Sequence, residues 1–151
     1  MEQKQLPYAA LIKQLSSETK KRADAALQES GLTMTQMYFL GVLARQPEGE
    51  APLKELERYF RVAQSTAAGV ASRLEKKGLV ASAPDENDRR VKRVRITASG
   101  DETLRRAIDT MERGEAQMLS PLTDSEQETL LRLLRKVHSA LRSEEGACPC
   151  P

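Results

Sequence analysis

Two short amphipathic segments separated by only three residues constrain the fold of this chain most strongly. Apolar residues at helical spacing fall on one side of residues 53–60 and of residues 64–77, namely Leu53, Leu56 and Phe60, then Ala67, Val70, Ala71 and Leu74. Gly78 supplies the left-handed residue that commonly follows a helix C-terminus. Two helices joined by a connection as tight as residues 61–63 predict a helix-turn-helix unit.

Two predicted strands follow this unit at once. Residues 79–83 and 91–96 are rich in strand-forming residues, and the polar, turn-forming residues 84–88 separate them. Alternation in the second strand places Val94 and Ile96 inward and Arg93 and Arg95 outward. The sequence therefore predicts a hairpin, or wing, beside the two helices.

Longer helices are predicted on both sides of this central portion. One runs from about Gln5 to Glu29, and capping boxes at Thr33 with Gln36 and at Thr123 with Glu126 open two others. Thr97 is the expected N-cap of a fourth, which extends to about Leu119. The fold class is mainly α with a small β-wing (α+β), a winged helix-turn-helix flanked by long terminal helices.

The expected division of the chain follows from this order. Residues 1–30 form an N-terminal dimerisation helix, residues 31–97 the winged lobe, residues 98–143 two C-terminal dimerisation helices and residues 144–151 a disordered tail. Long helices with leftover apolar surface can bury it against a second copy, so a homodimer is expected.

The composition excludes most other classes of protein. One histidine, His138, two cysteines and no tryptophan leave neither a metal cluster nor a nucleophile–base pair, and glycine-rich phosphate loops are absent. We expect no enzyme, cofactor or metal site. The longest uncharged stretch, residues 30–44, is too short and polar to span a bilayer, and the N-terminus lacks a secretory signal, so a cytoplasmic protein is expected.

The near-neutral net charge of +2 hides an uneven distribution. Residues 51–97 carry eleven basic and six acidic side chains, whereas residues 98–151 carry seven and ten. This asymmetry favours a central module that faces a polyanion. An ordinary solvated face is the alternative explanation. Aromatic residues are too few to stack on successive unpaired bases, which disfavours a single-stranded target.

Residues 64–77 are typical of a DNA recognition helix. The face opposite the apolar one is small and polar, and a helix with such a face can enter the major groove. An exposed, alanine-rich helix is the alternative. The predicted contacts to DNA from this helix are Gln64, Ser65, Thr66, Gly69 and Arg73.

The hairpin is strongly basic around Arg89, Arg90 and Lys92. A guanidinium at its tip could enter the electronegative minor groove, and the other cations of the hairpin, Arg93 and Arg95 among them, could neutralise phosphates. Asp88 is expected to orient the tip by pairing with an arginine. A solvated charged turn is the alternative.

Several blocks of sequence, in this order, resemble the MarR family of transcription regulators. They are Leu32-Thr33 with Gln36, Leu74-Glu75-Lys76-Lys77-Gly78-Leu79-Val80, Asp88-Arg89-Arg90, Ile96-Thr97-Ala98-Ser99-Gly100 and Leu122-Thr123-Asp124. The resemblance implies a homodimer, most often a repressor, that binds a pseudo-palindromic site in double-stranded DNA. By motif position, Arg90 is the minor-groove arginine and Asp88 its organiser.

Two departures from the family pattern concern the DNA contacts. Ala67-Ala68-Gly69 stands where relatives usually carry longer side chains, and Ser82 stands where an arginine commonly begins the wing. Specificity is therefore expected to depend on Gln64, Arg73, Arg90 and DNA shape.

The resemblance also implies a signal that releases the repressor, often a small lipophilic acid bound in a crevice. Tyr8, Met37 and Tyr38 are candidates for lining such a crevice, with a place in the core as the alternative. Cys148 and Cys150 could make the chain redox- or metal-responsive, although an inert tail is the simpler interpretation. A winged-helix module for protein contacts is the remaining alternative function.

Overall fold

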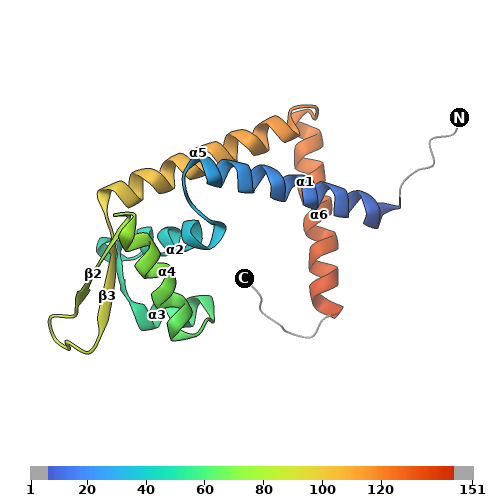
Figure 1. Cartoon of the computed structure of the whole chain (residues 1–151). Coiled ribbons are helices and arrows are strands. Elements are labelled where there is room, and N and C mark those ends of the chain that lie inside the picture. The colour runs from blue at the N-terminus through green and yellow to red at the C-terminus, as the bar shows by residue number, and fades with distance from the viewer. Residues whose placement is uncertain (1–6, 145–151) are drawn as a thin grey trace, which may run out of the picture. The chain divides into compact units, whose positions relative to one another are not determined.

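The computed structural model describes residues 7–144, which divide into two units at residues 114 and 115. The helices are α1 (Tyr8–Glu29), α2 (Met34–Ala44), α3 (Leu53–Phe60), α4 (Gln64–Lys76), α5 (Ala98–Leu119) and α6 (Asp124–Glu144), with a short 3-10 turn at Pro47–Gly49 (Figure 1). The strands are β1 (Glu50–Pro52), β2 (Val80–Pro84) and β3 (Lys92–Ile96). A mainly helical chain with a small wing is thus confirmed.

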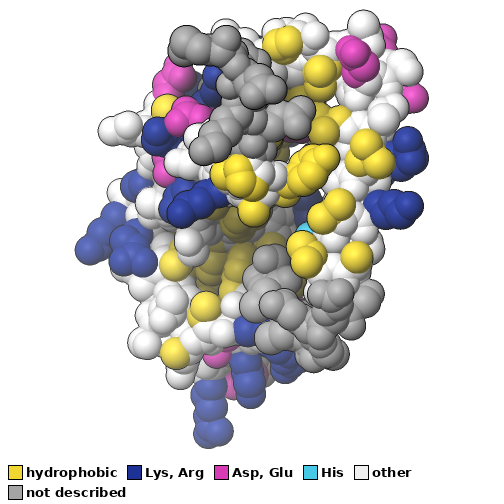
Figure 2. Space-filling view, turned by 90° about the vertical axis from the view of Figure 1, so that its right-hand side faces the viewer, with side chains coloured by type: hydrophobic (Ala, Val, Ile, Leu, Met, Phe, Trp, Pro, Cys, Tyr) yellow, Lys and Arg dark blue, Asp and Glu magenta, His cyan; other side chains and the backbone are white. Residues whose placement is uncertain are grey.

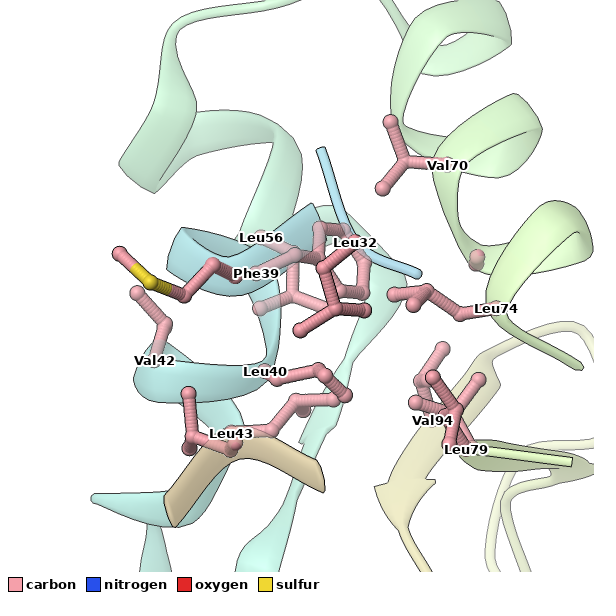
Figure 3. Packing of buried hydrophobic residues seen from close by; sticks show 14 of the residues in the cluster. Leu32, Phe39, Leu40, Val42, Leu43, Leu56, Val70, Leu74, Leu79 and Val94 are labelled. Atoms are coloured by element: carbon pink, nitrogen blue, oxygen red, sulfur yellow. The ribbon is translucent and has the colours of Figure 1, made fainter. Parts of the chain in front are cut away.

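The hydrophobic core lies between α2, α3, α4 and the sheet. Phe39, Leu40 and Leu43 of α2 are almost fully buried and belong to one cluster with Leu56 of α3 and Leu74 of α4 (Figure 3). The rings of Phe39 and Phe60 stack with centroids 5.7 Å apart. The inward faces predicted for the two short helices are confirmed, because Ala67, Val70 and Ala71 are buried as well. This core fixes the two helices against each other.

The sheet has one strand more than the sequence predicts. Its order is β1-β3-β2, all antiparallel, with Ala51 opposite Val94 and Ser82 opposite Val94 on the other side. β1 has only three residues and ends in a proline, so it lacks the alternation that identifies a strand in sequence. Val94 is buried and Arg95 exposed, as predicted from alternation.

The predicted helix starts are confirmed by their hydrogen bonds. Thr33 N–H donates to Gln36 Oε1 and Gln36 N–H to Thr33 Oγ1, both at 3.2 Å. At the start of α5, Gly100 N–H donates to Thr97 Oγ1 at 3.0 Å. At the start of α6, Glu126 N–H donates to Thr123 Oγ1 at 3.4 Å and Thr123 N–H donates to Glu126 Oε2 at 2.8 Å. Local sequence signals were sufficient for all three starts.

The two ends of the chain differ slightly from expectation. Among the described residues α1 begins at Tyr8, with Pro7 as its N-cap, and Glu144 is the last residue of α6 rather than the first of a tail. Residues 145–151, which include Cys148 and Cys150, lie outside the described residues. The interpretations of the cysteine tail therefore stay predictions.

Two helices expose apolar side chains along their length. On α6 the exposed stripe contains Leu130, Leu131, Leu133, Leu134, Val137 and Leu141. Figure 2 shows hydrophobic side chains exposed on one face of the molecule. On the N-terminal half of α1 the exposed apolar residues are Tyr8, Leu11, Ile12 and Leu15. Both stripes lie outside the core around α2. None of the helices between residues 7 and 144 is long and apolar enough to cross a membrane.

Candidate nucleic-acid interface

A sharp turn sets the angle between α3 and α4. Arg61 adopts the left-handed conformation (φ 51°, ψ 41°), and Val62 N–H donates to Glu57 O at 3.1 Å. This bonding ends α3 as a Schellman-type cap does, although an arginine occupies the usual glycine position. Only two residues then precede the start of α4, so the helix-turn-helix predicted from the three-residue connection has a defined corner.

The exposed side of α4 contains the residues that the sequence singled out. Gln64, Ser65, Thr66 and Arg73 are exposed, and Gly69 is half-buried. A Cβ at Gly69 would meet nothing closer than Arg73 Nη2 at 3.9 Å. Packing within the chain therefore does not require a glycine there, whereas a flat helix surface allows another molecule to approach closely. Ala67 is 1% exposed, so its small size serves the core and not this surface.

The N-terminus of α4 is electropositive and uncapped. Its N-cap is Ala63, which provides no side-chain acceptor, and its first turn holds no acidic residue. Ala63 O accepts the N–H groups of Thr66 and Ala67. The N–H groups before Thr66 lie at the positive end of the helix dipole and point out of the helix N-terminus. Free N–H groups at a helix N-terminus commonly bind phosphate groups.

The tip of the wing is organised by two aspartates. Asp85 Oδ1 accepts the backbone N–H groups of Asn87 at 2.8 Å and Asp88 at 3.2 Å, and Asp88 Oδ1 accepts that of Arg90 at 3.0 Å. The contact that the structure gives Asp88 is thus with the Arg90 backbone rather than with an arginine side chain. These bonds fix the direction in which residues 89 and 90 leave the turn.

Glu50 forms ion pairs with two arginines of the wing. Its Oε1 lies 3.0 Å from Arg93 Nε and its Oε2 lies 2.9 Å from Arg95 Nε, while Asp85 Oδ2 lies 3.3 Å from Arg93 Nη1. Both arginines are thus held in ion pairs that attach β1 and the turn to β3. The expectation that they neutralise phosphates stays a prediction.

Three cations of the wing remain available to a ligand. Arg89, Arg90 and Lys92 are exposed, and within residues 7–144 none of them has a carboxylate within ion-pair distance. A hydrogen bond from Ser82 N–H to Glu75 Oε1 at 3.0 Å joins β2 to α4. The basic tip and the recognition helix are therefore held in one unit.

The three candidates for a ligand crevice differ in their burial. Met37 is buried in the core, whereas Tyr8 of α1 is 88% exposed and Tyr38 of α2 is 56% exposed. The alternative, a place in the core, thus applies to Met37 and not to the tyrosines.

Sequence reasoning missed Asp85 and Glu50. Asp85 could have been recognised, because an aspartate two residues before Asn87 and three before Asp88 is a common turn-capping pattern. Glu50 gave no such signal, since it lies 43 residues from Arg93 in the sequence.

Glu50 gives the wing a dependence on pH. The hydrogen bond from Arg95 lowers the pKa of Glu50 below its ordinary value of 4.5. The carboxylate therefore stabilises the folded state above pH 4.5, and this contribution is lost progressively as the pH falls from 4.5 through the lowered pKa of the folded state. We expect Glu50→Gln to lower the thermal unfolding midpoint at neutral pH. Below pH 4.5 the variant and the parent protein should converge.

Thermal melts followed by circular dichroism across that range are the measurement. Glu86→Gln is the matched control, because Glu86 is an exposed carboxylate of the same hairpin and should have a smaller effect. A difference between Glu50→Gln and the parent protein that stays constant with pH would contradict the role of the charge.

The helix-turn-helix, the three-stranded wing and the long flanking helices define a winged helix-turn-helix protein. A family model described as the MarR family matches residues 30–91. The repressor NicR of Pseudomonas putida is 31% identical over 114 residues, 76% of this chain and 70% of NicR. The chain belongs to the MarR family.

Two further relatives extend the comparison. The transcriptional activatory protein BadR of Rhodopseudomonas palustris is 35% identical over 88 residues, which are 58% of this chain but 50% of BadR, so the match spans half the length of that relative. A solved structure of a variant of MepR from S. aureus, bound to an oligodeoxyribonucleotide, has a TM-score of 0.72 and 27% identity and covers 91% of this chain and 99% of MepR.

Proposed function

We propose that this chain is a DNA-binding transcription regulator that acts as a homodimer on a pseudo-palindromic site in double-stranded DNA. The observation that carries the proposal is the pairing of an uncapped, exposed helix N-terminus with three uncompensated cations in one unit, joined by Glu75 and Ser82. A major groove admits a helix, and the adjacent minor groove attracts arginine.

The roles of the individual residues follow from their positions. Gln64 and Arg73 face base edges from α4, and Ser65 and Thr66 lie in its first turn, where hydroxyl groups bind phosphate oxygens or bases. Gly69 permits the close approach. On the wing, Arg90 enters the minor groove under the control of Asp88, and Arg89 and Lys92 neutralise phosphates.

Dimerisation through α1 and α6 supports this arrangement. Each helix exposes a stripe of large apolar side chains that a single chain leaves in water, and specific dimers bury about 800 Å² per partner at such surfaces. A two-fold dimer presents two recognition helices, which matches a palindromic site.

The direction of regulation is proposed from the named relatives. NicR is a repressor and BadR an activatory protein. Because the match to NicR covers 76% of this chain and the match to BadR 58%, we infer a repressor. A small ligand or another signal releases it, and it acts in the cytoplasm, where the DNA lies.

Binding to duplex DNA at increasing salt tests the proposal. Neutralising Z phosphates makes log affinity fall with log salt with a slope of about −0.9Z. With Arg89 and Lys92 from each of two protomers in contact with phosphates, Z is about 4 and a slope of roughly −3 to −4 is expected. The measurement is fluorescence anisotropy on a site selected from a random duplex pool, with a scrambled duplex as control. No duplex binding at low salt would overturn the proposal and favour a winged-helix module for protein contacts.

A further inference from the structure

The C-terminal end of α4 is a junction for three segments of the chain. After Lys76, the N–H of Lys77 donates to Arg73 O at 3.3 Å, that of Gly78 to Glu75 O at 2.9 Å and that of Leu79 to Leu74 O at 3.0 Å. Gly78 has a φ of +71°, which glycine adopts without strain. The helix therefore ends in a hydrogen-bonded turn at residues 77–79. This turn contacts the α1–α2 turn and the start of α5.

Lys77 joins this end to the turn between α1 and α2. Its Nζ donates to Gly31 O at 2.5 Å and to Gln36 Oε1 at 2.9 Å. Gly31 lies two residues after the end of α1 and has a φ of +68°. Gln36 is 5% exposed and also caps α2 through Thr33. One ammonium group thus connects the end of α1, the start of α2 and the end of the recognition helix.

The start of α5 meets the same turn from another side. Thr97 N–H donates to Leu79 O at 3.1 Å and Thr97 Oγ1 donates to Gly78 O at 2.7 Å. A Cβ on Gly100 would lie 2.0 Å from Leu79 O, so the helix start approaches the turn as closely as glycine permits. Because these contacts are made by the backbone and a short side chain, they restrict movement of the start of α5 relative to residues 78–79.

The two attachments differ in how easily they can be broken. At the α5 attachment, Thr97 donates hydrogen bonds to two backbone carbonyl groups, and Gly100 allows the helix to approach closely. The α1–α2 attachment depends on a long, exposed lysine side chain. Its loss would leave the buried Gln36 Oε1 with the Thr33 N–H as its hydrogen-bond donor among the described residues. A charged donor makes stronger hydrogen bonds than a neutral one.

We propose that Lys77 is a positioning residue that sets the angle of α4 relative to the α1–α2 turn, so that a displacement of the C-terminal end of α1 reaches the recognition helix. The inference rests on the proposed function, because the angle of α4 matters for entry into a major groove. It assigns to Lys77 no contact with DNA.

Lys77→Met keeps most of the aliphatic stem and removes the ammonium group. We expect its affinity for the selected duplex to fall about tenfold, which is within the range for residues that couple two sites. The slope of log affinity against log salt should stay within about 0.5 of the parent protein, because no phosphate contact is lost. Lys77→Arg should recover part of the affinity, since it keeps a charged donor.

Lys76→Met is the matched control. Lys76 is the neighbouring exposed lysine and loses the same charge, but the described residues give it no hydrogen bond to the α1–α2 turn. An unchanged affinity in Lys77→Met would overturn the proposal. A slope that becomes shallower by about one unit per protomer would also overturn it, because that result identifies Lys77 as a phosphate contact.

Amide hydrogen exchange of the protein without DNA provides a second test. In Lys77→Met, peptides covering residues 29–36 and residues 73–79 should both exchange faster, whereas Lys76→Met should leave residues 29–36 unchanged. Unchanged exchange at residues 29–36 in Lys77→Met would overturn the proposal. Because this measurement needs no duplex, it distinguishes failure of the Lys77 inference from failure of the proposed DNA binding.

Discussion

Leu134→Glu is expected to convert the protein into a monomer that no longer binds its palindromic site tightly. Leu134 lies in the middle of the exposed apolar stripe of α6, where the proposed dimer buries its surface. Moving a carboxylate out of water costs several kcal/mol per ion, and a two-fold interface contains the substitution twice. The dimer dissociation constant should rise about a thousandfold or more. Sedimentation velocity over a range of protein concentrations measures this change.

Arg132→Glu is the matched control for the dimer. Arg132 precedes Leu134 by two residues, which at about 100° per residue places it on the opposite side of the helix. It introduces the same carboxylate outside the apolar stripe, so it should leave the dimer intact. If Leu134→Glu sediments as the parent protein does, α6 is not the dimer interface. Far-UV circular dichroism establishes that the variant monomer has kept its helices.

Arg90→Ala should weaken duplex binding more than removal of any other wing cation. Arg90 is exposed at the tip, its backbone is fixed by Asp88, and no carboxylate in the described residues compensates it. An arginine contact to DNA contributes about 1–3 kcal/mol, and a dimer loses two such contacts, so the affinity should fall at least about 30-fold. Anisotropy titrations on the selected duplex at constant salt measure the loss.

Two comparison variants separate a groove contact from simple charge. Arg132→Ala removes an arginine from α6 and should change affinity little. Arg90→Lys keeps the charge, but lysine is more strongly hydrated than arginine and presents no planar fork, so it should restore only part of the affinity for a site with a narrow minor groove. Equal affinities of Arg90→Ala and Arg132→Ala would contradict the role assigned to Arg90.

The elements that sequence predicted well are those whose signals are local. Thr33 with Gln36 and Thr123 with Glu126 each satisfy a helix start within four residues, and both boxes are present in the structure. The helical spacing of Val70 and Leu74 identified the buried face of α4 in the same way, because it depends on the period of a single helix. Family membership followed from the order of such local blocks.

The elements that sequence missed depend on partners distant along the chain. β1 is too short to have a pattern of its own and exists because Val94 of β3 pairs with Ala51. Arg93 and Arg95 alternate outward as predicted, yet their charges are compensated by Glu50, which no spacing rule connects with them. Asp88 was singled out correctly as a residue of the turn, but the group it contacts is the Arg90 backbone.

For this protein, the sequence by itself determined the helix-turn-helix, the wing, the helix starts and the exposed polar side of α4. Each of these follows from hydrophobic period, caps or turn residues within one short segment. Only the tertiary structure decided which cations remain free, because ion pairing depends on carboxylates brought in from other strands. It likewise decided that Lys77 lies at the α1–α2 turn, since that contact joins residues 41 and 46 positions apart through the packing of the core.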